Sequence, residues 1–247
     1  MRFDPPLLRG RLVRRYKRFL ADVEIAGRIE TVHCANPGSM LGLAEPGATV
    51  WLSRSPNPAR KLPLTWELVE VRGGLVGINT GCANRLVEEA LRAGRIPALD
   101  GYRDLRREVV CGSGSRIDFL LGRPGRPPCY VEVKSVTLAR GEAAEFPDAV
   151  TARGARHLRE LIALRKAGNR AVMLFLAQRG DCRCFTVAAD IDPAYAAALD
   201  LARQAGVEVL SHACRVSAEG IELGARLPLG LPRPAPASPL QIAAPRP

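Results

Sequence analysis

The stretch from Ser115 to Thr137 constrains the fold of this chain most, because two runs of alternating residues flank a connector rich in Gly and Pro. The connector spans Gly122–Pro128, and its composition favours a turn. Alternation with a period of two is typical of strands, whose successive side chains point to opposite faces. We therefore expect a β-hairpin with Ile117 and Phe119 on one face of its first strand and Asp118 on the other.

The second strand of this hairpin places Glu132 and Lys134 on one face. If the strands pair, Asp118 and Glu132 converge, and Lys134 lies one pleat further along, roughly 6 to 7 Å away. Two carboxylates suit Mg²⁺ or Mn²⁺, and a bound ion with a nearby ammonium can activate water and stabilise charge on a phosphate. The spacing resembles the PD-(D/E)xK nuclease motif. In the alternative interpretation the hairpin is simply amphipathic, with solvated pairs between Arg116 and Asp118 and between Glu132 and Lys134.

The charge of the chain favours a polyanionic partner. Its 247 residues carry a formal net charge of +11, and the pI is near 9.9. Nucleic acid is a better partner than a membrane, because the sequence has no apolar run near 18 residues and no basic amphipathic helix at a terminus. We expect a cytoplasmic location, since the N-terminal segment lacks the apolar core of a signal peptide. Seven scattered cysteines fit reduced structural thiols.

Residues 1–82 are expected to form an OB-like barrel, because five short strands follow one another without a clear helix. The densest positive charge lies in the first of these strands, with an aromatic ring among the cations. These predicted nucleic-acid-binding residues are Arg14, Arg15, Tyr16, Lys17 and Arg18. In an extended strand Arg14, Tyr16 and Arg18 would share one face and offer phosphate contacts beside a stacking surface. A solvated edge strand protected by its charge is equally consistent with the run.

Further cations are predicted to contact nucleic acid from a Pro-rich loop and from a later helix. The loop carries Arg60 and Lys61, and the helix carries Arg153 and Arg156. Each pair could instead serve only to solvate its segment. We place His157 on or beside the outer margin of the same helix, whose inner stripe is formed by apolar residues at helical spacing.

Residues 83–228 are expected to form an α/β (α+β) domain. Asn84 is a plausible cap for a helix in which Glu89, at the edge of the apolar stripe, can provide a third carboxylate. The run Arg170–Ala177 is apolar without alternation, which is typical of a strand covered on both faces. The order helix, three strands, helix, strand is that of a nuclease-type core and favours the metal-site interpretation. Residues 229–247 are rich in Pro and are predicted to be a disordered tail.

Taken together, several segments resemble the sugar fermentation stimulation protein A family. They are PPLLRGRLVRRYKRFLADV, HCANPGSM, NPARKLPLTWELVE, GINTGCANRLVEEA, SRIDFLL, CYVEVKSVTL, FPDAVTARGARHLREL and IDPAYA. The resemblance implies an N-terminal OB-like β-barrel followed by a PD-(D/E)xK nuclease-like domain. It also implies sequence-nonspecific DNA binding and a regulatory part in sugar, notably maltose, metabolism. Asp118, Glu132 and Lys134 match the catalytic positions of the nuclease, and Glu89 matches its helical Glu.

Three functions remain open at this level. The first is DNA binding along the phosphate backbone, the second adds Mg²⁺-dependent DNA cleavage, and the third is a metabolic effector or interaction module whose carboxylates only form ion pairs. The oligomeric state is also open, with a homodimer as one arrangement.

Overall fold

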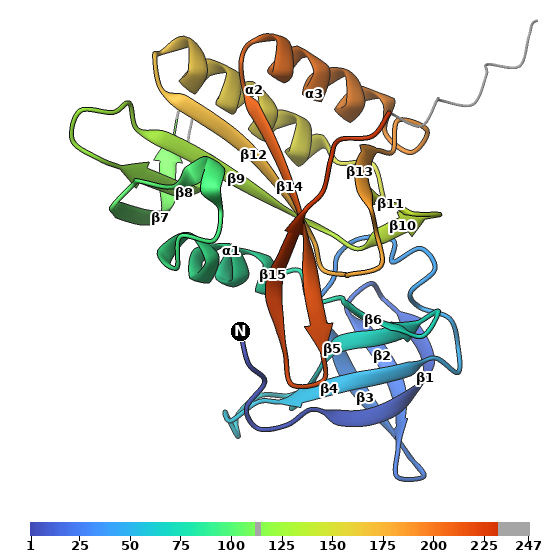
Figure 1. Ribbon diagram of the computed structural model, residues 1–247. Coiled ribbons are helices and arrows are strands. Elements are labelled where there is room, and N and C mark those ends of the chain that lie inside the picture. The colour runs from blue at the N-terminus through green and yellow to red at the C-terminus, as the bar shows by residue number, and fades with distance from the viewer. Residues whose placement is uncertain (112–114, 232–247) are drawn as a thin grey trace, which may run out of the picture.

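The computed structural model describes residues 1–111 and 115–231, and the first part of the chain forms a closed barrel (Figure 1). Its strands are β1 (Leu8–Tyr16), β2 (Leu20–Ile25), β3 (Arg28–Cys34), β4 (Thr49–Arg54), β5 (Leu64–Val71) and β6 (Gly74–Gly77). Strand β1 pairs with both β2 and β4, and a short parallel pairing of β3 with β5 closes the ring. The inward side chains, with fully buried Trp66 among them, form a separate apolar cluster. The predicted OB-like barrel is confirmed.

One detail of the first barrel strand differs from the prediction. Strand β1 ends at Tyr16, and Lys17 and Arg18 adopt left-handed conformations, with φ of 47° and 62°, in the turn to β2. Arg18 therefore does not share an extended strand face with Arg14. A tight two-strand turn needs positive φ, and this local requirement overrides the alternation of the basic run.

The second part of the chain is a six-stranded sheet with helices on both faces (Figure 1). The strand order is β15-β14-β12-β9-β8-β7. Its elements are α1 (Cys82–Arg92), the 3₁₀ turn η1 (Pro97–Leu99), β7 (Asp104–Cys111), β8 (Ser115–Gly122), β9 (Cys129–Val136), α2 (Ala152–Lys166), β12 (Arg170–Ala177), α3 (Pro193–Gln204), β14 (Glu208–Ser217) and β15 (Gly220–Arg226). Strand β12 runs parallel to β9 and β14, while β7, β8 and β9 are antiparallel neighbours. This is the predicted PD-(D/E)xK nuclease-like arrangement.

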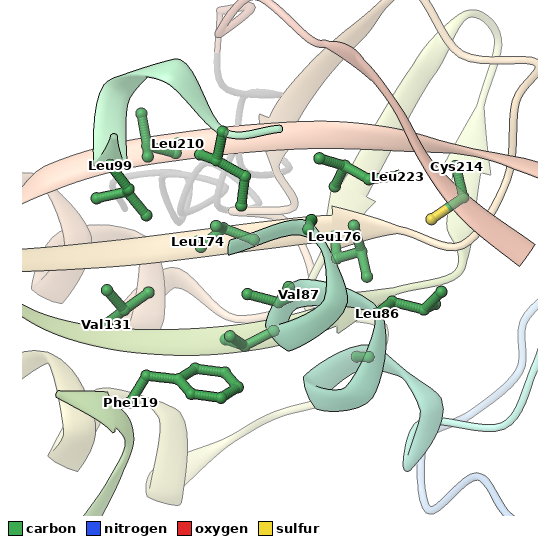
Figure 2. Close-up of a cluster of buried hydrophobic side chains, with 14 of the residues drawn as sticks. Leu86, Val87, Leu99, Phe119, Val131, Leu174, Leu176, Leu210, Cys214 and Leu223 are labelled. Atoms are coloured by element: carbon green, nitrogen blue, oxygen red, sulfur yellow. The ribbon is translucent and has the colours of Figure 1, made fainter. Parts of the chain in front are cut away.

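Strand β12 lies at the centre of this sheet and is buried along its length after Arg170. Alternate residues face two different apolar clusters: Leu174 belongs to the cluster against α1, and Phe175 to the cluster against α2 and α3. Figure 2 shows the first cluster, with Leu86 and Val87 of α1 beside the sheet residues. Coverage on both faces explains why the β12 sequence lacks polar alternation.

The sequence did not predict a small second sheet, and it predicted two local features wrongly. Strands β10 (Leu138–Arg140), β11 (Ala143–Phe146) and β13 (Cys184–Val187) pair to form it. Helix α1 starts from Gly81 without a side-chain cap, so Asn84 lies inside the helix. Ile117 packs in the cluster against α2, whereas Phe119 packs against α1, so the alternation of β8 breaks at Asp118. From residue 232 on, the predicted Pro-rich tail lies outside the described residues.

The barrel and the sheet are joined by main-chain hydrogen bonds. The Gly77 amide at the end of β6 donates to the Gln178 carbonyl just after β12, at 2.7 Å. A second joint lies on the barrel turn of residues 36–40, where the Ser39 hydroxyl donates to the Asp148 carbonyl at 2.6 Å and the Met40 amide to the Asp148 carboxylate at 3.1 Å. These contacts hold the two parts in a fixed relation.

Candidate functional site

Asp118 and Glu132 lie where strands β8 and β9 separate. The pairing of these strands runs from Leu121 opposite Cys129 to Phe119 opposite Val131, and the next pair in this register is Asp118 with Glu132. Beyond this pair the main-chain pairing of the two strands ends. The Val133 amide instead donates to the Asp118 side chain, at 2.8 Å from Oδ2. The predicted neighbourhood of the two acids is present in the structure.

The Asp118 carboxylate receives a second hydrogen bond from helix α1. Nδ2 of Asn84 donates to Asp118 Oδ1 at 2.7 Å. Sequence reasoning assigned Asn84 to the helix cap and missed this role. The position of Asn84 one turn before the buried Val87 is the signal that could have placed it on the sheet-facing side of α1.

Glu132 is almost fully buried, and its two oxygens have different surroundings. Oε1 is 2.6 Å from Lys134 Nζ and also contacts His157 Nδ1 of helix α2. Among the residues that the structure describes, the buried Oε2 has no hydrogen-bond partner. A buried carboxylate oxygen without a partner is costly, so Oε2 is available for a cation or an ordered water.

His157 is the second residue that sequence reasoning misplaced. It is 5% exposed and packs inward, rather than at the outer margin of α2. Gly154, Leu158 and Leu161 are buried on the same side of the helix, so the spacing i−3, i+1 and i+4 already placed position 157 on the inner stripe. Arg153 Nε donates to His157 Nε2 at 3.4 Å, and His157 Nδ1 contacts Glu132 Oε1 and lies 3.2 Å from Lys134 Nζ.

The pKa values of the two acids move in opposite directions. Burial, together with the negative charge of Glu132, raises the pKa of Asp118 to about 6. Burial also raises the pKa of Glu132, but the hydrogen bond from His157 and the charge of Lys134 outweigh it and hold that pKa below its ordinary value. Glu132 is thus the permanent anion of the pair, and a cation between the two would lower the pKa of Asp118.

These residues fit a divalent cation that needs few protein ligands. Within residues 1–111 and 115–231, no three His, Cys, Asp or Glu side chains gather closely enough to hold a metal ion by themselves. Mg²⁺ commonly uses one or two carboxylates and keeps waters for the rest, so Asp118 and Glu132 match its demand. The unpartnered Glu132 Oε2 and the raised pKa of Asp118 are the two features that a cation would relieve.

Glu89 does not lie with the other two acids. Its carboxylate is 2.6 Å from the Met1 amino group and 3.2 Å from Arg85 Nε. Glu88, one turn after Asn84, instead faces β7 and pairs with Arg107 at 3.1 Å. The geometry therefore gives no support to Glu89 as a third carboxylate of this site.

Several predicted nucleic-acid-binding residues on the barrel are engaged in contacts within the fold. Arg15 donates to the carbonyls of Arg18, Asn36, Gly38 and Ser39 and so secures the turn of residues 36–40. The guanidinium of Arg14 and the hydroxyl of Tyr16 both bind the Asp22 carboxylate, at 2.8 and 3.0 Å.

The remaining predicted cations are exposed. They are Lys17, Arg18, Arg60, Lys61, Arg153 and Arg156. Arg60 Nη2 lies 3.2 Å from His33 Nδ1, and Arg153 contacts His157 as described above. Together with Arg14, whose side chain is 68% exposed beside Asp22, these residues are the part of the prediction that the structure leaves accessible to a polyanion.

Comparisons with known families agree with the two-part architecture. The family model described as the SfsA N-terminal OB domain matches residues 13–78, and the model described as the sugar fermentation stimulation protein RE domain matches residues 81–220. The chain belongs to the sugar fermentation stimulation protein family. It is 59% identical over 231 residues to a sugar fermentation stimulation protein homolog of Rhodospirillum centenum, covering 93% of this chain and 99% of that one. A homolog from Paramagnetospirillum magneticum is 55% identical over 232 residues, covering 94% of this chain and 98% of that protein.

A solved structure of the family supports the same fold. The structure of Pyrococcus furiosus SfsA in complex with Ca²⁺ matches with a TM-score of 0.85 and 30% sequence identity, covering 93% of this chain and 98% of that chain. No helix in the described part of the chain is both long and apolar enough to cross a bilayer.

Proposed function

We propose that this member of the sugar fermentation stimulation protein family binds DNA along its phosphate backbone, without sequence preference, and holds a divalent cation between Asp118 and Glu132. The observation that carries the proposal is the buried, unpartnered Oε2 of Glu132 next to an Asp118 whose pKa is raised. Mg²⁺ or Mn²⁺ is the cation we expect in the cell, because both accept carboxylate and water oxygens. The Pyrococcus furiosus relative was solved with Ca²⁺, another cation that prefers oxygen ligands.

The DNA-binding part of the proposal depends on charge. A net charge of +11 and exposed cations on both parts of the molecule favour a polyanion. Lys17 and Arg18 lie on the barrel, and Arg153 and Arg156 lie on α2. Contacts of this kind to phosphate position a protein on DNA and carry no sequence information directly.

Two measurements test this proposal. Titration calorimetry should detect binding of Mg²⁺ or Mn²⁺ by the wild type and none by Asp118→Ala. DNA affinity should fall steeply with salt, since each phosphate contact releases counterions. A protein that binds neither metal nor DNA would favour the effector interpretation, in which the carboxylates form only ion pairs.

Hydrolysis of the DNA backbone is a second candidate, favoured by the position of Lys134. Its ammonium is held 2.6 Å from Glu132, and its side chain retains 14% exposure. It can therefore donate a hydrogen bond to a water or phosphate oxygen beside the two acids. A divalent cation, when bound, supplies a Lewis acid and a more acidic water.

A nuclease assay separates this candidate from DNA binding alone. Supercoiled plasmid should be nicked by the wild type in Mg²⁺ and left intact by Lys134→Ala and Asp118→Ala. Nicking that is unchanged in Asp118→Ala would identify a contaminating nuclease. Intact plasmid with normal metal and DNA binding would leave the protein as a DNA binder only.

A further inference from the structure

A cleft of about 480 Å³ lies between the barrel and the sheet, and its lining does not include Asp118 or Glu132. On the barrel side it is lined by Arg18 and the turn of residues 36–38. On the sheet side it is lined by Ser135, which follows Lys134 on β9, and by Arg153 at the start of α2. Arg153 also contacts His157, the partner of Glu132, so one residue of the cleft lining is connected to the candidate metal site through a single side chain.

The barrel wall of this cleft is held rigidly against the sheet. Arg15 donates to three carbonyls of the turn formed by residues 36–39, and the Asn36 side chain binds the Ile78 carbonyl at 2.9 Å. A Cβ at Gly38 would lie 2.3 Å from the Asp148 carboxylate, so only glycine permits this close approach. Because Asp148 accepts from Met40 in the turn, its negative charge is directed at the barrel. The cleft cannot widen without breaking these contacts.

The size of the cleft limits which nucleic acid can enter. Its volume is within the range of about 300–1,000 Å³ that is usual for small-molecule pockets. Such a space accommodates a short piece of one strand, whereas a double helix, whose major groove alone is about 12 Å wide, does not fit between fixed walls.

The burial of the acids also favours a single strand over a duplex. The side chain of Glu132 is 2% exposed and that of Lys134 is 14% exposed, so both lie below the surface. The phosphates of an intact duplex are held on a stiff cylinder and cannot reach a recessed carboxylate without deformation. An unpaired strand bends freely enough to bring one phosphate down to it.

The lining also has the chemistry that single strands require. Arg18 and Arg153 place a cation on each wall, and the apolar surfaces of Pro37, Phe146 and Val150 lie between them. Proteins that hold single-stranded DNA combine a cationic groove along the backbone with apolar or aromatic surfaces against the bases.

We propose that this cleft binds an unpaired DNA strand, with phosphates at Arg18 and Arg153, and guides it to Asp118 and Glu132. The proposal rests on the DNA-binding function proposed above and adds the substrate class. A protein that acts on ends, flaps or gaps with an unpaired strand would present this cleft to its substrate, and intact duplex would bind only at the exposed cations outside it.

The test compares a fluorescently labelled 20-nucleotide oligothymidine with a duplex of about the same length, in Ca²⁺, using the full chain. We expect the single strand to bind at least tenfold more tightly. Arg18→Ala should weaken single-strand binding about fivefold and lower its log–log salt slope by about 0.7, the value for one lost contact. Arg28→Ala is the matched control, because Arg28 is an exposed cation of the barrel at the start of β3 that neither lines the cleft nor belongs to the proposed DNA contacts.

The control should change single-strand affinity less than twofold. Equal losses in Arg18→Ala and Arg28→Ala, or duplex affinity equal to that for the single strand, would overturn the cleft proposal while leaving DNA binding in place. Failure to bind either DNA would instead remove the proposed function itself. Thermal unfolding of both variants should match the wild type, because both side chains are exposed.

Discussion

The barrel and the sheet each bury a glutamate, and they satisfy its charge differently. In the barrel, Glu67 accepts from Ser53 at 2.6 Å on one oxygen and from Asn79 at 2.8 Å on the other. In the sheet, Glu132 receives Lys134 and His157 on the same oxygen, and within the described part of the chain the second oxygen has no partner. Burial alone therefore does not distinguish a functional acid from a structural one. We expect the distribution of donors over its two oxygens to make this distinction.

The largest expected effect is on metal affinity, when the buried carboxylate of Glu132 is replaced by a neutral amide. Glu132→Gln should lower affinity for Mg²⁺ or Mn²⁺ by more than about 100-fold, beyond the 10–100-fold typical of residues that only support a ligand. The measurement is titration calorimetry. Glu67→Gln is the matched control, since it removes a buried charge of the same kind and should leave metal affinity unchanged. Loss of metal affinity in both variants would show that the contrast between them has no functional meaning.

Removing the Asn84 side-chain amide, which donates to Asp118, should have a smaller effect on metal affinity. Asn84→Ala deletes the donor to Asp118 Oδ1, and we expect metal affinity to fall about 10-fold or more. The neighbouring Arg85→Ala, which changes an exposed side chain of the same helix, should have no such effect. Unchanged affinity in Asn84→Ala would mean that the Val133 amide alone orients the carboxylate.

Lowering the pH should change the stability of the two parts in opposite directions, through Asp118 in the sheet and Asp22 in the barrel. In the metal-free protein the pKa of Asp118 is about 6, above the ordinary 3.8, so the folded state binds this proton more tightly than the unfolded chain does. Its contribution to stability is present at low pH and is lost as pH rises from about 4 to about 6. The pKa of Asp22 in the barrel is lowered by the hydrogen bond from Arg14, so its contribution is present above 3.8 and is lost as pH falls below that value.

Thermal unfolding in EDTA across pH checks both signs. At neutral pH Asp118→Asn should be more stable than the wild type, by on the order of 1–3 kcal/mol. Asp22→Asn should be less stable than the wild type at neutral pH and should lose this difference in acid. A stabilised Asp22→Asn would refute the distinction between the two acids.

The smallest expected effect comes from leaving an oxygen of Glu67 without a donor. Ser53→Ala should lower the free energy of unfolding by about 1–2 kcal/mol, because a buried acceptor loses its hydrogen bond. Ser55→Ala in the exposed loop nearby serves as the control for chemical denaturation.

The sequence predicted the strand pairing and the meeting of the two acids because both depend on local periodicity. The turn between the two strands and the pairing from Leu121–Cys129 to Phe119–Val131 leave little freedom in the register, and this register sets Asp118 opposite Glu132. The start of helix α2 at Ala152 also depends on a local signal, since the Thr151 side chain accepts a hydrogen bond from the Gly154 amide and caps the helix. The central strand β12 was likewise predictable from its uninterrupted apolar run.

Contacts between distant segments could not be predicted in this way. The partners of Arg15 lie on a turn more than 20 residues away, and nothing in the basic run indicates that carbonyls, rather than phosphates, will bind it. The Glu89 carboxylate pairs with the Met1 amino group because the first residues pack against β15. His157 is an intermediate case, since helical spacing placed it inward but could not name Glu132 as its partner.

The joint between the two parts sets a fixed distance. Because the Gly77–Gln178 and Ser39–Asp148 hydrogen bonds pin the barrel turn to the end of the sheet, the separation between Arg18 and the paired acids hardly varies from one molecule to the next. A DNA strand bound at Arg18 would therefore reach the two acids after a constant number of nucleotides. If the protein cleaved such a strand, the fragments would share a narrow range of lengths.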